Sequence, residues 1–327
     1  MNERLTWISA LAPRTSPEEI VTHLNRIYHK YEAAVFDRQH PELTEQLPEV
    51  WSRLLQAASP PPGEPPRQVL DFGCGTGFEA LQLLETIEPG SLRLLVCYDL
   101  SAEMLARCRE KLSRFEAPLK FTTSLDEVLE FAQARCFDLV VTNSLLHHLP
   151  DWRATARLFR DLLAPGGFWI NGHEPSVSFY RNSECRTVLE DYRRWRRWRK
   201  FLDARAWVRR VSTLLGITPN LARLTAREFN SLGLTSLPVP ERMVTLLVDL
   251  NVPHNEREAE SVGLNPTQMA EELARDFDQA FLETYSYMGP FYEGRLPRRW
   301  RSRAQDLRLR FPTDGAEFAA VWRRKRG

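Results

Sequence analysis

The sequence predicts an α/β protein with a Rossmann-like, mostly parallel seven-stranded sheet, helices on both faces, an N-terminal helical cover and a helical insertion after strand 5. Three observations support this fold class. Apolar strand-like runs alternate with helical runs over residues 67–175, a glycine-rich turn joins a strand to a helix within 69–85, and two strand-like runs return near the end of the chain. Near-continuous apolar strands that alternate with helices are typical of a parallel sheet covered on both faces.

The N-terminal part reads as helical. Residues 16–37 open with Ser16 and Glu19 in capping-box spacing and continue with apolar residues at helical spacing, and a second helix is predicted over 42–57. Five prolines then fall between Pro60 and Pro66, where neither a helix nor a central strand can continue because proline has no N–H to donate. We therefore expect a helical cover over 1–60 and a proline-rich linker over 61–66.

The core region alternates five strands with four helices. The predicted strands are 67–73, 92–100, 119–125, 137–146 and 166–175, and the predicted helices are 77–87, 101–115, 126–135 and 152–163. Residues 176–275 break this rhythm with helical patterns, and strand patterns return at 279–288 and 315–325. We therefore expect a core made of 67–175 and 276–327, with a helical cap or substrate insertion over 176–275.

The composition excludes several classes of protein. The net charge of the 327 residues is +1, so no global field favours nucleic acid or a membrane surface, and no apolar run of 18 residues predicts a spanning helix. The N-terminus contains acids and no long apolar stretch, which argues against a signal peptide. The five cysteines are scattered, without a C-x-x-C pair, which argues against a disulfide framework and a cysteine-based zinc site. A cytoplasmic protein is the expectation.

The turn after the first strand reads "DFGCGTGFE", with glycines at Gly73, Gly75 and Gly77. Glycines in such a turn let the backbone approach a ligand at the carboxyl edge of a parallel sheet. The register is G-x-G-x-G, and Phe78 stands where the third glycine of a dinucleotide loop would be. Asp99 ends the next strand, where an acid can accept hydrogen bonds from both ribose hydroxyls. A nucleoside ligand other than a dinucleotide is therefore predicted.

Four segments in this order resemble the motifs of class I S-adenosylmethionine-dependent methyltransferases. They are "VLDFGCGTGFEAL", "LLVCYDLSAEML", "FDLVVTNSLLHHLPD" and "LFRDLLAPGGFWINGHEP". The resemblance implies S-adenosylmethionine as the cofactor, with S-adenosylhomocysteine as the product. It implies that the cofactor's amino-acid part, ribose, adenine and sulfonium lie against Asp71, Gly73, Gly75, Gly77, Asp99, Leu100, Ser124, Leu125, Asn143, Ser144 and His148.

Candidates for catalysis and substrate binding are fewer. His148, His173 and Glu174 could act as a general base, although methyl transfer needs a base only where the nucleophile must lose a proton. His147 and His148 are adjacent, so we expect them to face different ways and to share no metal, and no metal site is predicted. Cys74 is interpreted as a small filler. Substrate contacts are assigned to Tyr28, Tyr31, Glu174 and His254, with Asn251 beside them.

The segment 191–210 is rich in arginine and tryptophan. It predicts an amphipathic cap helix whose inward face consists of Tyr192, Trp195, Trp198 or Arg199, and Leu202. An anionic substrate, RNA phosphates or a membrane surface remain alternatives for its basic face. The fourth strand reads "TNSLLHH" rather than an N-P-P-Y-type tetrad, so DNA is not expected as a substrate.

The function predicted is methyl transfer to a small molecule of the kind met in secondary metabolism, on O, N or C. The alternatives are an RNA or lipid methyltransferase that uses the basic helix, and a cofactor-binding protein of the same fold with another activity. The oligomeric state stays open.

Overall fold

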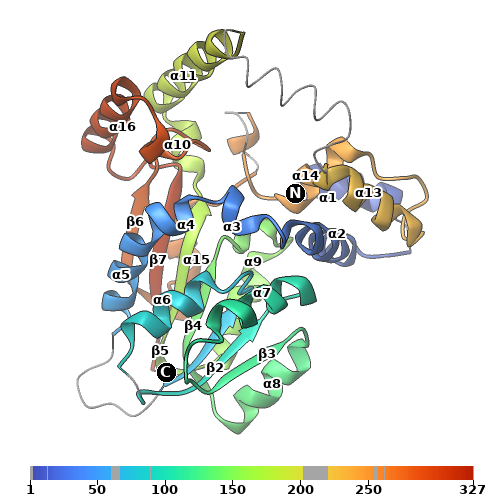
Figure 1. Ribbon diagram of the computed structural model, residues 1–327, viewed down its shortest axis with the longest axis vertical. Helices are drawn as coiled ribbons and strands as arrows, with labels where there is room; N and C mark the ends of the chain where they lie inside the picture. The colour runs from blue at the N-terminus through green and yellow to red at the C-terminus, as the bar shows by residue number, and fades with distance from the viewer. Residues whose placement is uncertain are drawn as a thin grey trace.

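The computed structural model describes residues 3–12, 14–59, 67–88, 90–201, 220–253, 257–260 and 262–326. They contain one seven-stranded sheet in the order β3-β2-β1-β4-β5-β7-β6 (Figure 1). The strands are β1 (Arg67–Phe72), β2 (Leu92–Tyr98), β3 (Leu119–Thr122), β4 (Phe137–Asn143), β5 (Leu163–Pro175), β6 (Phe277–Tyr285) and β7 (Glu317–Arg324). Neighbouring strands are parallel except where β7 pairs with β5 and β6. The predicted fold class is confirmed.

Helices cover both faces because the strands are apolar on both sides. Successive residues of β1 show this, since Val69 belongs to a core under α5, α6 and α7, while Leu70 belongs to a second core under α8, α9 and α15. The helices of these layers are α5 (Leu47–Ala57), α6 (Phe78–Thr86), α7 (Ala102–Leu112), α8 (Leu125–Ala134), α9 (Trp152–Leu162) and α15 (Pro266–Leu273). Ser101 and Asp151 cap α7 and α9 by accepting main-chain N–H bonds, as their positions before apolar helical runs favour.

The N-terminal helices differ from the prediction in their breaks. The helix expected over 16–37 is α2 (Pro17–Glu32), followed by the short α3 (Phe36–Gln39). The helix expected over 42–57 is interrupted at Gln46, between α4 (Glu42–Glu45) and α5. Pro48 explains the break, because it lacks the N–H that a continuous helix would use there and fits only a first turn. The predicted linker 61–66 lies outside the described residues.

Two helices of the N-terminal segment and two helices of the insertion after β5 share one hydrophobic core. They are α1 (Glu3–Leu11), α2, α13 (Leu221–Ser231) and α14 (Glu241–Val248), which form a lobe beside the carboxyl edge of the sheet (Figure 1). Ile8, Leu24, Phe229 and Leu247 are fully buried within it. The N-terminal segment and the insertion after β5 are therefore one packed unit over this edge. The sequence patterns did not predict α1.

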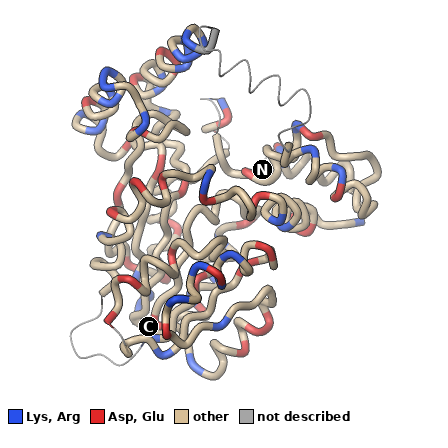
Figure 2. The backbone as a smooth tube through the Cα atoms, viewed as in Figure 1, with Lys and Arg blue, Asp and Glu red and all other residues tan. Residues whose placement is uncertain are grey.

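The arginine- and tryptophan-rich segment begins in α11 (Ser183–Phe201), which follows α10 (Val177–Arg181) and packs against α16 (Arg298–Arg310). Tyr192 and Trp195 turn inward onto Trp300, while Trp198 is 76% exposed. Positions of lysine and arginine are frequent along α11 and α16 (Figure 2). Tyr192 and Trp195 therefore lie on the inward face as predicted, whereas Trp198 does not. Residues 202–210 lie outside the described residues. Among the described helices, none combines the length and the apolar character needed to cross a bilayer.

Candidate functional site

The glycine loop links β1 to α6 and adopts backbone conformations that favour glycine. Gly73, Gly75 and Gly77 have φ angles of +79°, +50° and +84°. A Cβ at Gly73 would lie 2.8 Å from Leu145 Cδ1, and one at Gly77 would lie 2.7 Å from Cys108 Sγ. The main-chain N–H groups of Gly73 and Cys74 donate to the carbonyl of Tyr98 at 2.8 and 3.0 Å. The loop is therefore fixed against the end of β2, with no side chain between its backbone and a ligand at Gly75.

Asp99, immediately after β2, meets this loop as predicted. Its Oδ2 accepts from the N–H of Gly75 at 2.9 Å, and its Oδ1 accepts from the N–H of Ser101 at 2.8 Å. Burial raises the pKa of Asp99, against the lowering effect of these two bonds. The carboxylate thus stands between the loop and the start of α7, where a ribose acceptor is needed.

Asp71 is fully buried, and neither of its carboxylate oxygens has a hydrogen-bond partner among the described residues. Burial and the neighbouring Glu79 raise the pKa of Asp71 well above its usual range. An orphaned carboxylate at the entrance of the glycine loop suits a cationic ligand group, reached directly or through an ordered water. The predicted cofactor carries two such cationic groups, its ammonium and its sulfonium.

The adenine side of the predicted site has an apolar surface. Leu100 and Leu125 are 39% and 37% exposed. Ser124 caps α8, its Oγ accepting from the N–H of Glu127 at 3.3 Å. The sequence therefore brings the two leucines to an exposed edge where a flat base can cover them, while the hydroxyl of Ser124 already has a structural partner.

The carboxyl ends of β4 and β5 hold the remaining predicted residues. Asn143 accepts a hydrogen bond from the indole N–H of Trp51 at 3.1 Å, so its amide oxygen is directed to α5. Ser144 has a left-handed backbone (φ +52°), and its N–H donates to the carbonyl of Gly172. These contacts fix the segment that leads from β4 into the turn η1 (Leu146–His148).

A buried His–Glu pair lies in this turn. His147 Nδ1 is 2.8 Å from Glu174 Oε2, and Glu174 is fully buried. The same carboxylate accepts the main-chain N–H groups of Leu145, Leu146 and His147 at 2.8, 2.8 and 3.2 Å. Because the carboxylate oxygens accept all four of these contacts, we assign a hydrogen of the His147 ring to Nδ1, where it donates to Glu174.

The two adjacent histidines do not face different ways. Their ring centroids lie 4.0 Å apart, and one nitrogen of each lies within 4.8 Å of the other and of an Asp249 carboxylate oxygen. The prediction from adjacency was wrong because Glu174 and the carbonyl of Val248 draw the two rings to the same side of the turn: His148 Nδ1 is 2.8 Å from Val248 O. Burial, with His147 and His29 nearby, lowers the pKa of His148 well below its usual value.

His173 precedes Glu174 and also has a left-handed backbone, with φ +54°. Its Nδ1 is 3.1 Å from the hydroxyl of Tyr285, and burial lowers its pKa to about 4. His173 is therefore neutral at ordinary pH and too weak a base to hold a proton there. Of the other two predicted candidates for a base, Glu174 lies in the site as the partner of His147. His148 lies in the same turn, with its Nδ1 against the carbonyl of Val248. The sequence analysis did not select His147, although its place in the "LLHHLP" turn after β4 was the available signal.

The predicted substrate residues divide into three cases. Tyr28 is partly buried beside His29, whose ring makes an edge contact with His148 at 5.2 Å, so this part of α2 borders the site. Tyr31 donates its hydroxyl to Glu228 Oε2 at 2.5 Å and thus links α2 to α13. His254 lies outside the described residues. Asn251 holds the turn from above, its N–H donating to His147 O and its amide to Leu149 O, both at 2.8 Å.

Residues 70–169 match the family described as "Methyltransferase domain". A highly reducing polyketide synthase of Preussia isomera is 30% identical over 171 residues, 49% of this chain and 6% of the synthase. An uncharacterized methyltransferase of Mycobacterium tuberculosis is 32% identical over 99 residues, 30% of this chain and 46% of the relative. The ubiquinone/menaquinone biosynthesis C-methyltransferase of Bradyrhizobium diazoefficiens is 28% identical over 152 residues, 46% of this chain and 58% of the relative.

The solved structure of the CurJ carbon methyltransferase superposes with a TM-score of 0.46 at 16% identity, covering 85% of this chain and 54% of that one. The chain spans a small part of the synthase and about half of the smaller relatives it matches.

Proposed function

We propose that this chain, whose residues 70–169 match the family of methyltransferase domains, uses S-adenosylmethionine to methylate an acidic carbon of a small molecule. The acceptor would be a carbon beside a carbonyl or phenol oxygen, as in a β-ketoacyl thioester or a hydroxylated ring. Two relatives support this class of acceptor: one is a polyketide synthase, and the other is a C-methyltransferase of quinone biosynthesis.

The observation that carries the proposal is the His147–Glu174 pair, joined at 2.8 Å and closed from bulk water. An amine or a phenolate needs little help to attack an activated methyl group, whereas a carbon acid must first lose a proton. A histidine whose Nδ1–H is held by a buried carboxylate has its Nε2 lone pair fixed in orientation, and the carboxylate stabilises the imidazolium that forms. A protein that only positions its acceptor would not need this pair.

The cofactor, when bound, supplies the activated methyl group and a neutral thioether leaving group. The proposed holders are the glycine loop and Asp71 for its amino-acid part, Asp99 for the ribose, and Leu100 and Leu125 for the base. His147 Nε2 takes the proton from the acceptor carbon, and the electron pair of that C–H bond forms the new bond to the methyl carbon. The oxygen next to the carbon carries the negative charge in between.

The lobe over the carboxyl edge is proposed to enclose the acceptor. We assign residues 1–60 as its N-terminal cover and 176–275 as its insertion, with 67–175 and 276–327 as the core. The shared packing of α1, α2, α13 and α14 supports this division, as does the contact of His29 with His148. Closure of this kind excludes water from the carbanion-like acceptor, which would otherwise regain its proton.

The experiment separates proton removal from methylation. The chain is incubated in D₂O with a β-ketoacyl thioester, a phenol or an amine, each with and without S-adenosylmethionine. Mass spectrometry then identifies the products. We expect methylation of the carbon acid, and exchange of its acidic hydrogen for deuterium above the uncatalysed rate when S-adenosylhomocysteine replaces the methyl donor. His147→Gln should abolish both while the affinity for S-adenosylhomocysteine stays within about 3-fold.

Methylation only on the oxygen of the phenol or the nitrogen of the amine, with His147→Gln fully active, would contradict the proposal. His23→Gln is the matched control and should stay active, because His23 lies on α2 and contacts Glu19 and Arg26 of the same helix.

A further inference from the structure

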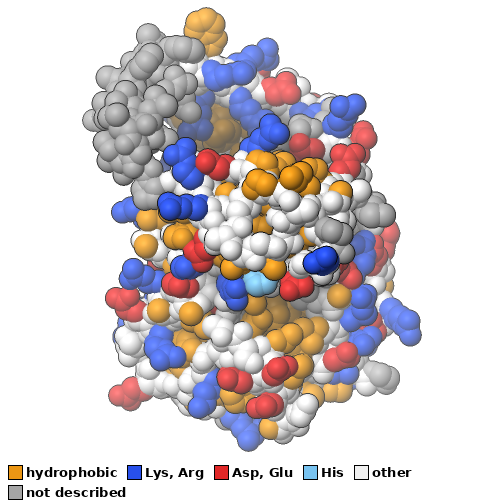
Figure 3. Space-filling view, turned by 90° about the vertical axis from the view of Figure 1, so that its right-hand side faces the viewer, with side chains coloured by type: hydrophobic (Ala, Val, Ile, Leu, Met, Phe, Trp, Pro, Cys, Tyr) orange, Lys and Arg blue, Asp and Glu red, His pale blue; other side chains and the backbone are white. Residues whose placement is uncertain are grey.

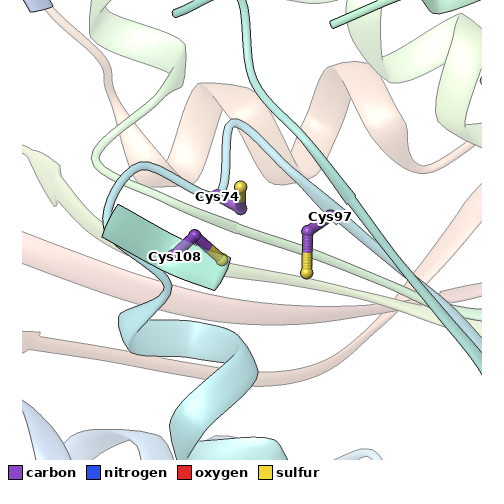
Figure 4. A group of neighbouring side chains, drawn as sticks. All are labelled: Cys74, Cys97 and Cys108. Carbon is purple, nitrogen blue, oxygen red and sulfur yellow. The ribbon is translucent and has the colours of Figure 1, made fainter. Parts of the chain in front are cut away.

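Three cysteines from separate parts of the chain meet beneath the glycine loop. Cys74 lies in the loop itself, Cys97 in β2 and Cys108 in α7 (Figure 4). All three are free thiols with exposed fractions of 1%, 0% and 0%. Their sulfur atoms all lie within 4.8 Å of one another. Sequence spacing could not reveal this cluster, because it depends on how β1, β2 and α7 pack.

We propose that Cys74, Cys97 and Cys108 form a binding site for one thiophilic d¹⁰ metal ion, best suited to Cu(I). Three sulfurs bound at about 2.3 Å around one ion lie about 4.0 Å apart, so the site needs only a small contraction. Soft thiolate ligands select Cu(I) and Zn(II), and Zn(II) usually requires a fourth ligand. Among the described residues no fourth metal-ligating side chain joins the group, which favours the ion that accepts three sulfurs.

The cluster has buried carboxyls beside it. Asp71 and Glu79 both interact electrostatically with Cys108, and the oxygens of Asp71 have no hydrogen-bond partner among the described residues. A metal ion bound by the three sulfurs would displace the protons of the thiols that it takes up.

The site is mechanically linked to the loop that we propose holds the cofactor, and this step rests on that proposed function. Gly77 stands directly against Cys108, where a Cβ would lie 2.7 Å from the sulfur, and Cys74 is part of the loop. Drawing the three sulfurs together pulls the loop toward β2 and α7. We therefore expect metal binding to weaken S-adenosylmethionine binding, and the cofactor to weaken metal binding by the same factor.

The experiment titrates the reduced, metal-free chain with Cu(I) under anaerobic conditions, in competition with a chromogenic Cu(I) chelator and without any methyl donor. We expect one ion per chain and a loss of affinity of about 100-fold or more in Cys97→Ala and in Cys108→Ala. Cys185→Ala is the matched control, because Cys185 is equally buried but belongs to the core between α10, α11 and α16. Its affinity for Cu(I) should equal that of the wild type.

A second measurement does not depend on any variant folding. X-ray absorption of the Cu(I)-loaded wild type should show about three sulfur neighbours near 2.3 Å. Absence of stoichiometric binding, or a first shell of nitrogen or oxygen, overturns the proposal. Because neither readout involves methyl transfer, failure of the metal site leaves the methyltransferase proposal standing, and the reverse also holds.

Discussion

Ser144 Oγ donates a hydrogen bond to the carbonyl oxygen of His173 at 3.1 Å, and both residues have left-handed backbones although neither is glycine. They lie at the carboxyl ends of the neighbouring strands β4 and β5. Such conformations cost about 1–3 kcal/mol each and persist where the surrounding structure enforces them. Here the pair turns Glu174, the next residue, inward onto the N–H groups of residues 145–147. The strain therefore lies where the proposed base is positioned.

Substitutions at His173 test this strain. His173→Asn should lose only the roughly 1–3 kcal/mol of an unpaired buried hydroxyl, because asparagine tolerates φ near +54°. His173→Val should be about 1–3 kcal/mol less stable than the asparagine variant. Both lose the contact with the hydroxyl of Tyr285, so their difference isolates the backbone term. The free energy of unfolding in urea measures it. Equal stabilities of the two variants would show that the left-handed conformation is not enforced.

Removal of the Asp99 carboxylate should weaken the binding of S-adenosylmethionine. We expect a loss of about 10–100-fold for Asp99→Ala, the value of hydrogen bonds to a charged group. Some thermal stability should be lost as well, since the N–H groups of Gly75 and Ser101 lose their acceptor. Calorimetric titration measures the affinity, and Asp126→Ala, an acid in the first turn of α8, serves as the control. Unchanged affinity in Asp99→Ala would remove Asp99 from the cofactor site.

Alanine variants of two glycines with the same backbone conformation distinguish backbone strain from a steric clash of the added Cβ. Gly77 and Gly90 have φ of +84° and +85°, but a Cβ would meet Cys108 only at Gly77 and nothing within 4 Å at Gly90. Gly90→Ala should cost about 1 kcal/mol of stability, and Gly77→Ala about 1–3 kcal/mol more together with cofactor affinity. Thermal denaturation and calorimetry measure the two effects. If both variants lose the same stability, the loop is not packed tightly on α7.

The core of the fold could be predicted from the sequence because its signals are local. Apolar runs, capping residues such as Ser101 and the turn glycines each act within a few residues, and together they specify the alternation of strands and helices. The N-terminal helices were predicted less well. The interruption at Gln46 depends on one proline in a first turn, and α1 buries only a few side chains against partners more than 200 residues away.

The sequence predicted the parts of the candidate site that depend on strand topology. It did not predict the contacts that depend on side-chain packing. Gly73, Gly75, Gly77 and Asp99 meet because the ends of neighbouring parallel strands always meet. The pairing of His147 with Glu174 depends on a tight turn and a strained His173, neither of which a residue pattern reveals. The meeting of three cysteines likewise required the register of β1 on β2, in which Asp71 pairs with Cys97, and the position of α7.

Space-filling views show acidic and basic side chains intermixed over the face in Figure 3, in keeping with the net charge of +1. One connected group of charged side chains lies in the N-terminal cover. His40 Nδ1 is 2.7 Å from Glu42, and Glu32 lies between His40 at 3.8 Å and His29 at 3.0 Å. These four side chains, the His29–Glu42 charge network, link α2 to α4 beside the proposed acceptor site.

The free energy of unfolding should therefore depend on pH through the His29–Glu42 charge network. Burial alone would lower the pKa of His40, but hydrogen bonds with Glu32 and Glu42 outweigh it and raise the pKa to about 9. Since the ordinary value is 6.5, the stabilisation by His40 is complete below pH 6.5 and is lost as the pH rises through 9. Burial raises the pKa of Glu32, but His29 and His40 outweigh it and lower the pKa to about 2. Its stabilisation is present above its ordinary value of 4.5 and is lost as the pH falls toward 2.

The stabilisation by His40 and that by Glu32 are both complete between pH 4.5 and 6.5. There the charge network contributes most to the free energy of unfolding. Urea denaturation at a series of pH values should show the midpoint falling between pH 6.5 and 9 in the wild type. Glu32→Gln should flatten this slope, because His40 then keeps only Glu42 as a partner. Glu45→Gln is the control, since Glu45 pairs with Arg295 instead. An unchanged slope in Glu32→Gln would mean that the charge of Glu32 does not hold the cover on the core, and the acceptor pocket would then need another closing contact.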